Sequence, residues 1–457
     1  MTTPQSTPAT LPNAELLKQL FNALPDSAQG GADISGIYVN RSPDNEHDAV
    51  ANLHQFISWA PGSSDTYLFS GLRGAGKTTE LSRLVAELRK DSIAAYYCDA
   101  STYLNLNDPH LSLVELLMAA LAGLSDAVRK ELGKDCLSDT IWQRTKRLLN
   151  SNVEFKPSAK ASSSVDVFGS SVSLEVEATL QENPDFRKEL NLFAQSSTSF
   201  YAEAATFAKD VARIIQAKTG CEKIVLVVDS LERLSAPSGD ETKLFDSLKE
   251  VFFNDPQRLR FPCFSVVYSA PPYLHAVLPS VGTGFSQCVS LPNFKVIQRP
   301  AVGAQPARNP DGIQKMVEIV GHRFADWPQV LSQAVLEELA WMSGGNVRRY
   351  FSLIRGVARK AALSKAPLPI VEPHAPAVRH AISEAALPLQ WLTAQDRLWL
   401  DRFMQDSHNP SAYIQNLKTD LPSIIRLFDH SLVLDYQNGS VWYQVPQIVR
   451  ESVQPHA

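Results

Sequence analysis

The residues best suited to do chemistry form one glycine-rich run, Gly71-Leu72-Arg73-Gly74-Ala75-Gly76-Lys77-Thr78. This run matches the phosphate-binding pattern G-x-x-x-x-G-K-[ST] at every defined position. Its glycines let backbone N–H groups turn toward phosphate oxygens without a Cβ in the way. A competing interpretation is a glycine-rich turn with an exposed lysine. The apolar segment YLFS before the run and the amphipathic pattern after it favour the phosphate site.

The pattern assigns a role to each polar residue of the run. Lys77 supplies a positive charge for the β- and γ-phosphates of a nucleotide, and the Thr78 hydroxyl can bind Mg²⁺. We predict that the nucleotide is ATP and that these residues bind it: Gly71, Arg73, Gly74, Ala75, Gly76, Lys77, Thr78 and Thr79.

A second part of the same site is predicted at Asp229. Residues 224–228 read Ile-Val-Leu-Val-Val, the strongest buried-strand pattern in the chain, and Asp229 follows them directly. The carboxyl end of a parallel strand lies at the sheet edge where the phosphate loop also begins. We therefore predict Thr78 and Asp229 as the Mg²⁺ ligands, with Asp229 acting through water.

Two further residues are candidates for catalysis. Ser230 follows Asp229, so the next carboxylate along the chain is Glu232. We predict that Glu232 is the base that polarises the attacking water, the alternative being a structural ion pair with slow hydrolysis. Ser269 follows the apolar residues 263–268 and is predicted to contact the γ-phosphate. Otherwise it simply ends a strand.

The elements that must position these residues alternate between strand and helix from about residue 36 to 298. Strand patterns alternating with helical ones predict a parallel sheet with helices on both faces, which is the α/β fold class of P-loop proteins. Strands are expected at 67–70, 93–98, 224–228, 263–268 and 287–291, with helices at 77–90, 111–124, 200–217 and 243–253. The Ser-rich residues 151–180 interrupt this order and are predicted to form an inserted β-hairpin.

Three other regions flank this predicted core. Residues 1–35 hold a loose tail and a short helix from Asn13, which either docks on the core or contacts a partner; we favour docking. Residues 299–376 are predicted to form a helical lid. Residues 377–457 follow the order helix, helix, hairpin, which is typical of a winged-helix domain, and Gln437-Asn438-Gly439 is the expected hairpin turn.

The segments GLRGAGKTT, IVLVVDSLER, VVYSAPP and SGGNVRRYF together resemble the AAA+ and STAND branches of the P-loop ATPases. The spacing of the two acids resembles STAND and KAP-type proteins, and the lid resembles Orc/Cdc6-like proteins. The resemblance implies that Arg348 reaches the γ-phosphate, with Arg349 as the alternative. It also implies a trans-acting arginine, but residues 271–287 contain no Arg or Lys, so Arg258 and Arg260 are the nearest substitutes.

Composition limits the remaining classes. The formal net charge is −5, which argues mildly against a general nucleic-acid binder. The five cysteines have no metal-site spacing. The start of the chain does not read as a signal peptide and no apolar run is long enough to span a membrane, so we expect a cytoplasmic protein.

The resemblance implies an ATP-dependent switch, an ATPase that controls a homo-oligomer or a protein effector, with relatives in bacterial phage defence. A DNA-binding initiator or transposition ATPase is one alternative. It is disfavoured because the predicted recognition helix 421–430 and the wing 433–445 carry only one Arg and no Lys. A nucleotide-binding scaffold without turnover is the other alternative. We expect the C-terminal region to contact protein through Tyr436, Trp442 and Tyr443.

Overall fold

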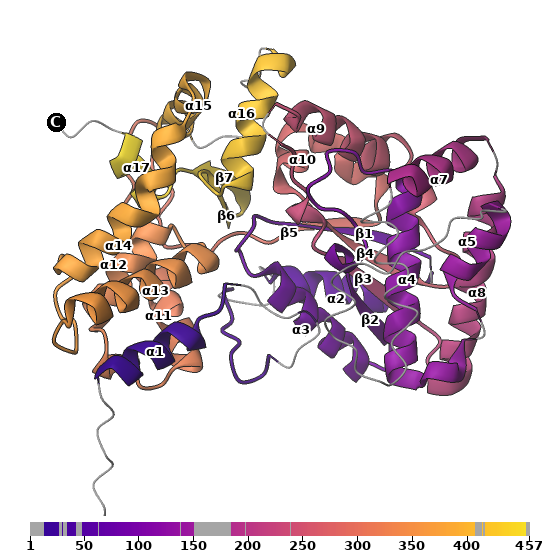
Figure 1. The fold of residues 1–457 in the computed structure, drawn as a ribbon, viewed down its shortest axis with the longest axis horizontal. Helices are drawn as coiled ribbons and strands as arrows, with labels where there is room; N and C mark the ends of the chain where they lie inside the picture. The colour runs from indigo at the N-terminus through magenta and orange to yellow at the C-terminus, as the bar shows by residue number, and fades with distance from the viewer. Residues whose placement is uncertain are drawn as a thin grey trace, which may run out of the picture.

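The structure, a computed structural model, describes residues 13–26, 30, 34–42, 48–62, 64–137, 139–149, 184–196, 198–237, 239–406, 414 and 416–453 (Figure 1). The hairpin predicted within residues 151–180 lies outside the described residues. Within the described ranges, no helix is both long and apolar enough to cross a bilayer.

Five parallel strands form the central sheet in the order β2-β3-β4-β1-β5. They are β1 (Thr66–Ser70), β2 (Ala94–Asp99), β3 (Ile224–Asp229), β4 (Ser265–Ala270) and β5 (Gln287–Ser290). Strands β1, β3 and β4 are buried along their whole length, which explains why their sequences are continuous rather than alternating apolar runs. The predicted parallel sheet is confirmed.

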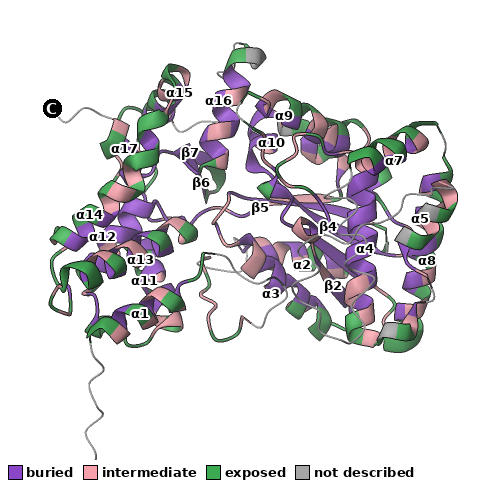
Figure 2. Cartoon of the chain, viewed as in Figure 1, coloured by how far each residue is buried: buried purple, intermediate pink, exposed green. Residues whose placement is uncertain are grey.

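Helices cover both faces of the sheet because successive residues of each strand point in opposite directions. Val225 and Val227 of β3 pack with helices α2 (Ala49–Trp59) and α3 (Lys77–Lys90). Leu226 and Val228 belong to the larger cluster that contains α4 (Leu113–Leu132) and α8 (Ser199–Thr219). In Figure 2 much of α4, beside the sheet, is coloured as buried. The α/β P-loop fold class is confirmed.

Further helices surround this layered core. α5 (Ile141–Leu149) and α7 (Pro184–Ser196) pack against α4 and α8. α9 (Glu241–Lys249) and α10 (Pro272–Val277) lie between β3 and β5 in the chain and contact the C-terminal helix α16 (Leu417–Asp429).

Four helices follow the sheet: α11 (Pro310–Arg323), α12 (Gln333–Ser343), α13 (Val347–Ser364) and α14 (Pro376–Ala386). Gly344 ends α12 with a φ of 68°, and Asn346 caps α13 by accepting a hydrogen bond from the Arg349 N–H at 3.1 Å. This Gly-Gly-Asn junction is the one that the sequence predicts. We refer to α11–α13 as the lid.

The N-terminal helix α1 (Asn13–Ala23) packs on α13 of the lid. Leu16, Leu17 and Leu20 form its buried face. The Arg355 guanidinium lies 4.2 Å from the centre of the Phe21 ring and forms an ion pair with Asp26. The helix is predicted to dock on the core, and the structure instead places it on the lid, where its buried leucines pack against α13.

The last region contains α15 (Ala394–Gln405), α16, the antiparallel pair β6 (Leu434–Asn438) and β7 (Ser440–Gln444), and α17 (Gln447–Val453). This is the predicted order of helix, helix and hairpin, and Gly439 has the positive φ of 75° that the turn requires. We refer to residues 394–453 as the C-terminal module.

The three aromatic residues of the hairpin, Tyr436, Trp442 and Tyr443, are buried, which corrects the expectation that they form a surface for a partner. Tyr436 and Trp442 are fully buried and stack with ring centres 4.6 Å apart. Tyr443 is also buried and packs edge-to-face on Phe428 at 5.4 Å. These rings form contacts within the chain because the hairpin lies between the lid and the sheet (Figure 1).

Candidate nucleotide-binding site

The glycine-rich loop lies where the chain changes direction across the sheet. β1 is flanked by β4 and β5, whereas the next strand along the chain, β2, lies at the far edge. The carboxyl ends of strands at such a switch point form a crevice for ligands in α/β proteins. The loop leaves β1 after Ser70 and enters α3 at Lys77, so the positive end of that helix faces the same crevice.

Two glycines of the loop adopt conformations that other residues rarely take. Gly74 has a φ of 79° and Gly76 a φ of 99°. Gly74 also lies against the lid, since a Cβ at this position would be 2.6 Å from both the Arg348 Cβ and the Asn346 Oδ1. The loop therefore needs glycine at position 74 for its backbone and for its approach to the lid.

The Lys77 ammonium is turned onto the loop itself. Its Nζ donates to the carbonyls of Gly71 and Leu72 at 2.7 and 2.8 Å and lies 3.3 Å from Glu232 Oε1. Burial lowers the pKa of Lys77, while the charges of Glu232 and Asp229 raise it. A phosphate group entering the loop would replace the carboxylate of Glu232 as the counter-charge of Lys77.

Asp229 and Thr78 meet at the edge of the sheet as predicted. The Thr78 hydroxyl donates to Asp229 Oδ2 at 2.8 Å, and the Tyr97 hydroxyl donates to the same oxygen at 2.6 Å. Burial, followed by the charge of Glu232, raises the pKa of Asp229 to about 6.

The donor set at this point fits Mg²⁺. Asp229 Oδ1 and Glu232 Oε2 are buried and have no hydrogen-bond partner among the described residues. Buried carboxylate oxygens without partners are costly unless a cation or water completes them. Hard oxygen ligands from a hydroxyl and carboxylates are those that Mg²⁺ prefers. The Thr78 hydroxyl would bind the ion directly, and Asp229 would also hold it.

Glu232 is held in place by a strained turn. Ser230 has a φ of 74°, and residues 231–233 form one 3₁₀ turn that directs the buried Glu232 carboxylate at Lys77. Ser269 Oγ accepts a hydrogen bond from the Leu231 N–H at 2.9 Å. Ser269 thus supports the backbone of this turn, and it is not among the residues that line the cavity described below. Its predicted contact with the γ-phosphate stays a prediction.

The structure separates the roles of the two candidate lid arginines. Arg348 lines the cavity at the phosphate loop, and its N–H donates to the Gly74 carbonyl at 3.2 Å. Its Nε donates to the Asp26 carbonyl at 3.1 Å, and burial lowers its pKa. Arg349 points away and donates to the carbonyls of Ser431 and His430 at 2.8 and 3.3 Å. Of these two candidates, Arg348 is the one that lines the cavity, where Arg323 of α11 also lies.

A cavity of about 370 Å³ opens in front of the loop. Its polar side includes Lys77, Thr78, Thr79, Glu232 and Arg348 of the predicted site, with Asp99 and Arg233 beside them. The predicted residues Gly71, Arg73, Ala75 and Asp229 do not line it. Its apolar side comes from the lid and from the segment between α1 and α2, which we call the N-terminal connector. The residues are Ile34, Ile37, Val347 and Phe351. A flat, apolar group such as a nucleotide base would fit this side. The sequence offers one signal for it, the apolar residues that follow Gly31, but no pattern assigns them.

Arg73 connects the loop to three other parts of the chain. Its side chain donates to the carbonyls of Glu232 and Leu234 at 3.1 and 2.9 Å. Its own carbonyl accepts from Asn346 Nδ2 of the lid at 2.8 Å and from Ser431 Oγ of the C-terminal module at 3.2 Å. Sequence reasoning predicted a phosphate contact for Arg73, and the structure shows a connecting role.

Arg41 is a site residue that sequence reasoning missed. Its guanidinium donates to the carbonyls of Ala75 and Pro292 at 2.8 and 2.7 Å and to Glu80 at 3.2 Å. It also lies 4.5 Å from the centre of the Phe294 ring. Arg41 thereby fixes the back of the phosphate loop to the segment that leads into the lid.

Comparison with known proteins gives only distant likenesses. The chain matches no model of a protein family. No curated protein matches it either. Among solved structures, it is similar to the ORC2 protein of Aeropyrum pernix in ADPNP–ADP complexes, with 13% identity over 91% of this chain and 94% of that one and a TM-score of 0.39. It is also similar to the Thermotoga maritima RuvB Holliday junction branch migration motor, with 12% identity over 86% and 88% of the two chains and a TM-score of 0.33. The assignment of the site rests on the geometry of this chain.

Proposed function

We propose that the protein binds ATP with Mg²⁺ and uses the bound nucleotide to set the arrangement of its lid and C-terminal module. The observation that carries this proposal is the cavity itself. It brings Gly74, Gly76, Lys77 and Thr78 of the phosphate loop together with Arg348 of the lid in one space, and Thr78 is hydrogen-bonded to Asp229. Nucleotide affinity, measured by calorimetry with ATP and with ADP in the presence of Mg²⁺, tests it directly. Absence of binding to the folded protein would refute it.

Hydrolysis in this proposal depends on Glu232. Thr78 and Asp229 would hold Mg²⁺, which would supply positive charge against the phosphates of the nucleotide. Lys77 leaves Glu232 for the phosphates, and the freed carboxylate accepts a proton from the water that attacks the γ-phosphate. Arg348 stabilises the negative charge of the γ-phosphate from the lid. The products are ADP and inorganic phosphate.

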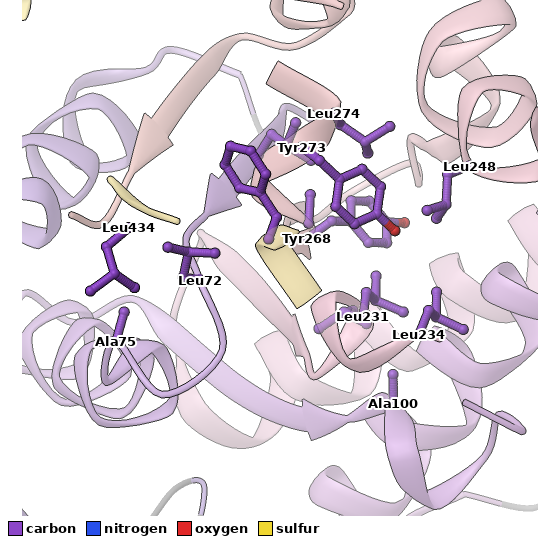
Figure 3. Packing of buried hydrophobic residues seen from close by; sticks show 14 of the residues in the cluster. Leu72, Ala75, Ala100, Leu231, Leu234, Leu248, Tyr268, Tyr273, Leu274 and Leu434 are labelled. Atoms are coloured by element: carbon purple, nitrogen blue, oxygen red, sulfur yellow. The ribbon is translucent and has the colours of Figure 1, made fainter. Parts of the chain in front are cut away.

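The contacts around the phosphate loop support a switch. The Arg73 carbonyl is hydrogen-bonded by the lid and by the C-terminal module, and the Gly74 carbonyl by the lid. Figure 3 shows Leu434 of β6 close to Leu72 and Ala75 of the loop. The same few loop residues contact the lid, the C-terminal module and the phosphates. Nucleotide binding at the loop therefore changes the contacts that hold the lid and the C-terminal module.

The ion pairs of Arg426 argue against DNA binding through the C-terminal module. Arg426 is the basic residue of the predicted recognition helix, and it forms ion pairs with Glu241 at 2.9 Å and Asp396 at 2.8 Å. An arginine whose charge is neutralised by two carboxylates attracts the phosphates of a DNA duplex only weakly. We further propose that the protein is cytoplasmic and that its nucleotide state controls a homo-oligomer or a protein effector, as in phage-defence switches. The mass of the assembly in ATP and in ADP tests this step.

One observation favours a second candidate, a nucleotide-binding scaffold without turnover. Glu232 is engaged in a buried ion pair with Lys77, and a carboxylate held in this way is less free to act as a base. If the pair persists when nucleotide binds, hydrolysis is slow. Single-turnover measurement of phosphate release from pre-bound ATP separates the two functions.

A further inference from the structure

Asp229 is held by a tyrosine that is no part of the phosphate-binding pattern. Tyr97 lies on β2 directly opposite Val227 of β3. Because side chains alternate along a strand, Val227 and Asp229 lie on the same face of the sheet. The Tyr97 ring packs against the cluster on this face and extends along it to Asp229, where its hydroxyl donates at 2.6 Å. Two neighbouring strands thus bring together residues 132 positions apart.

The hydrogen bonds leave the two oxygens of the Asp229 carboxylate in different states. Oδ2 accepts from both Tyr97 and Thr78, whereas Oδ1 is buried with no hydrogen-bond partner among the described residues. Two donors on one oxygen fix the plane of a carboxylate. The remaining oxygen then keeps its lone pairs for a cation or a water of its shell.

The Tyr97 ring is itself confined by the N-terminal connector. Gly30 lies so close that a Cβ on it would be 2.1 Å from the ring atoms Cε1 and Cζ. The same connector supplies Pro25, Asp26 and Ile34 to the wall of the cavity. Burial and the charge of Asp229 both raise the pKa of the Tyr97 hydroxyl, which therefore remains a hydrogen-bond donor.

We propose that Tyr97 is a positioning residue that holds Asp229 with Oδ1 directed toward the Mg²⁺ of the bound nucleotide, and that Gly30 keeps the ring in place. This inference rests on the proposed function, since it concerns the metal of that site. It adds a specific prediction, because the Tyr97 hydroxyl donates to Asp229 and Tyr97 does not line the nucleotide cavity: loss of this hydroxyl weakens the contribution of Mg²⁺ to nucleotide binding and leaves the affinity without metal unchanged.

The test compares Tyr97→Phe with Tyr96→Phe. Tyr96 is the next residue on the same strand, and its buried hydroxyl has no hydrogen-bond partner among the described residues, so its loss controls for removal of a buried hydroxyl. ADP affinity is measured by calorimetry for each full-length protein with Mg²⁺ and with EDTA. Removal of groups that orient metal ligands typically costs 10–100-fold in metal affinity. In Tyr97→Phe, we expect the ratio of ADP affinity with Mg²⁺ to ADP affinity with EDTA to be about 10-fold smaller than in the unmodified protein. Tyr96→Phe should match the unmodified protein in both conditions.

Other outcomes identify which statement fails. If Tyr97→Phe keeps the full gain from Mg²⁺, the positioning role is wrong while nucleotide binding stands. If the unmodified protein binds no ADP in either condition, the proposed function fails and this inference with it. An equal loss with Mg²⁺ and with EDTA would mean a general structural role and overturn the proposal. Gly30→Ala is the second variant, because its methyl group displaces the ring without removing the hydroxyl; it should also lose the gain from Mg²⁺, and an unchanged gain would refute the role of Gly30.

Discussion

At the scale of single residues, Lys77 and Glu232 form a buried ion pair that nucleotide must break. Lys77 is 3% exposed and Glu232 is 6% exposed, so neither charge is screened well by solvent. The pair satisfies both groups before a phosphate arrives. The two residues therefore have opposite expected effects on binding and on turnover.

We expect Lys77→Ala to abolish measurable ATP binding, because the loop loses the charge that faces the β- and γ-phosphates. Glu232 would then be buried without a partner, so the variant is also expected to be less stable. Calorimetric titration with ATP checks the binding, and circular dichroism checks the fold. Lys90→Ala, at the exposed end of the same helix, is the matched control and should bind normally. Unchanged ATP affinity in folded Lys77→Ala would contradict the assignment of the loop.

Glu232→Gln is expected to retain ATP and to hydrolyse it about 10²–10³-fold more slowly, the range for loss of a general base. The amide keeps the shape of the side chain but cannot accept the proton from water. Phosphate release under single-turnover conditions measures the effect. Normal turnover in this variant would place the base elsewhere and leave Glu232 as the structural partner of Lys77.

At the scale of elements, the junction between α12 and α13 links the lid to the chain that leaves β5 and to the C-terminal module. Gly345 has a φ of 84°, and a Cβ on it would lie 1.9 Å from the Phe294 carbonyl oxygen. Gly344 meets the hairpin, where the Tyr436 hydroxyl donates to its carbonyl at 2.6 Å. The two glycines let the lid approach the chain that leaves β5 on one side and the C-terminal module on the other.

We expect Tyr436→Phe to lower the free energy of unfolding by about 1–3 kcal/mol, the cost of leaving a buried carbonyl without its donor. Chemical denaturation measures the change. Tyr350→Phe is the control, because the buried Tyr350 hydroxyl of the lid has no hydrogen-bond partner among the described residues. It should change stability little. Equal stabilities for both variants would show that the contact between hairpin and lid contributes nothing.

At the scale of the whole molecule, the C-terminal module is joined to the sheet core by buried acids. Burial raises the pKa of Asp429 to about 7, against the lowering effect of Arg73, which lies 3.9 Å away. Burial also raises the pKa of Asp435 to about 6, while Asn293 donates to its Oδ1 at 2.7 Å. Both carboxyls bind protons more tightly in the folded chain than in the unfolded one.

The contribution of these two carboxyls to stability should therefore fall as pH rises from about 4 to about 7, in the opposite direction to that of His275 and His430, whose pKa values burial lowers. An acid whose pKa is raised by folding holds its proton in the folded state above the pKa of the unfolded state, and the slope of stability against pH is negative in that window. Thermal unfolding of the nucleotide-free protein at about pH 5.5 and about pH 8 measures the effect. Asp429→Asn should make stability depend less on pH above about pH 6. The pH dependence that comes from Asp435 and Asp229 should remain. The same pH dependence in Asp429→Asn as in the unmodified protein would contradict the raised pKa of Asp429.

The sequence by itself determined the phosphate loop, the strand that ends at Asp229, the cap at Asn346 and the alternation that gives a parallel sheet. Each of these depends on residues within a few positions of one another, where backbone geometry and side-chain periodicity decide the outcome. The positive φ values of Gly74 and Gly76 follow from the same local requirement.

Only the tertiary structure decided which distant residues complete the site. The Tyr97–Asp229 hydrogen bond depends on β2 and β3 being neighbours, and the Ser431–Arg73 bond joins residues 358 positions apart. The burial of Tyr436 and Trp442, which the sequence placed at a partner surface, depends on where the hairpin packs. Strand order and packing between modules set these contacts, and neither leaves a periodic signal in the chain, because the partners can be exchanged without changing the local pattern.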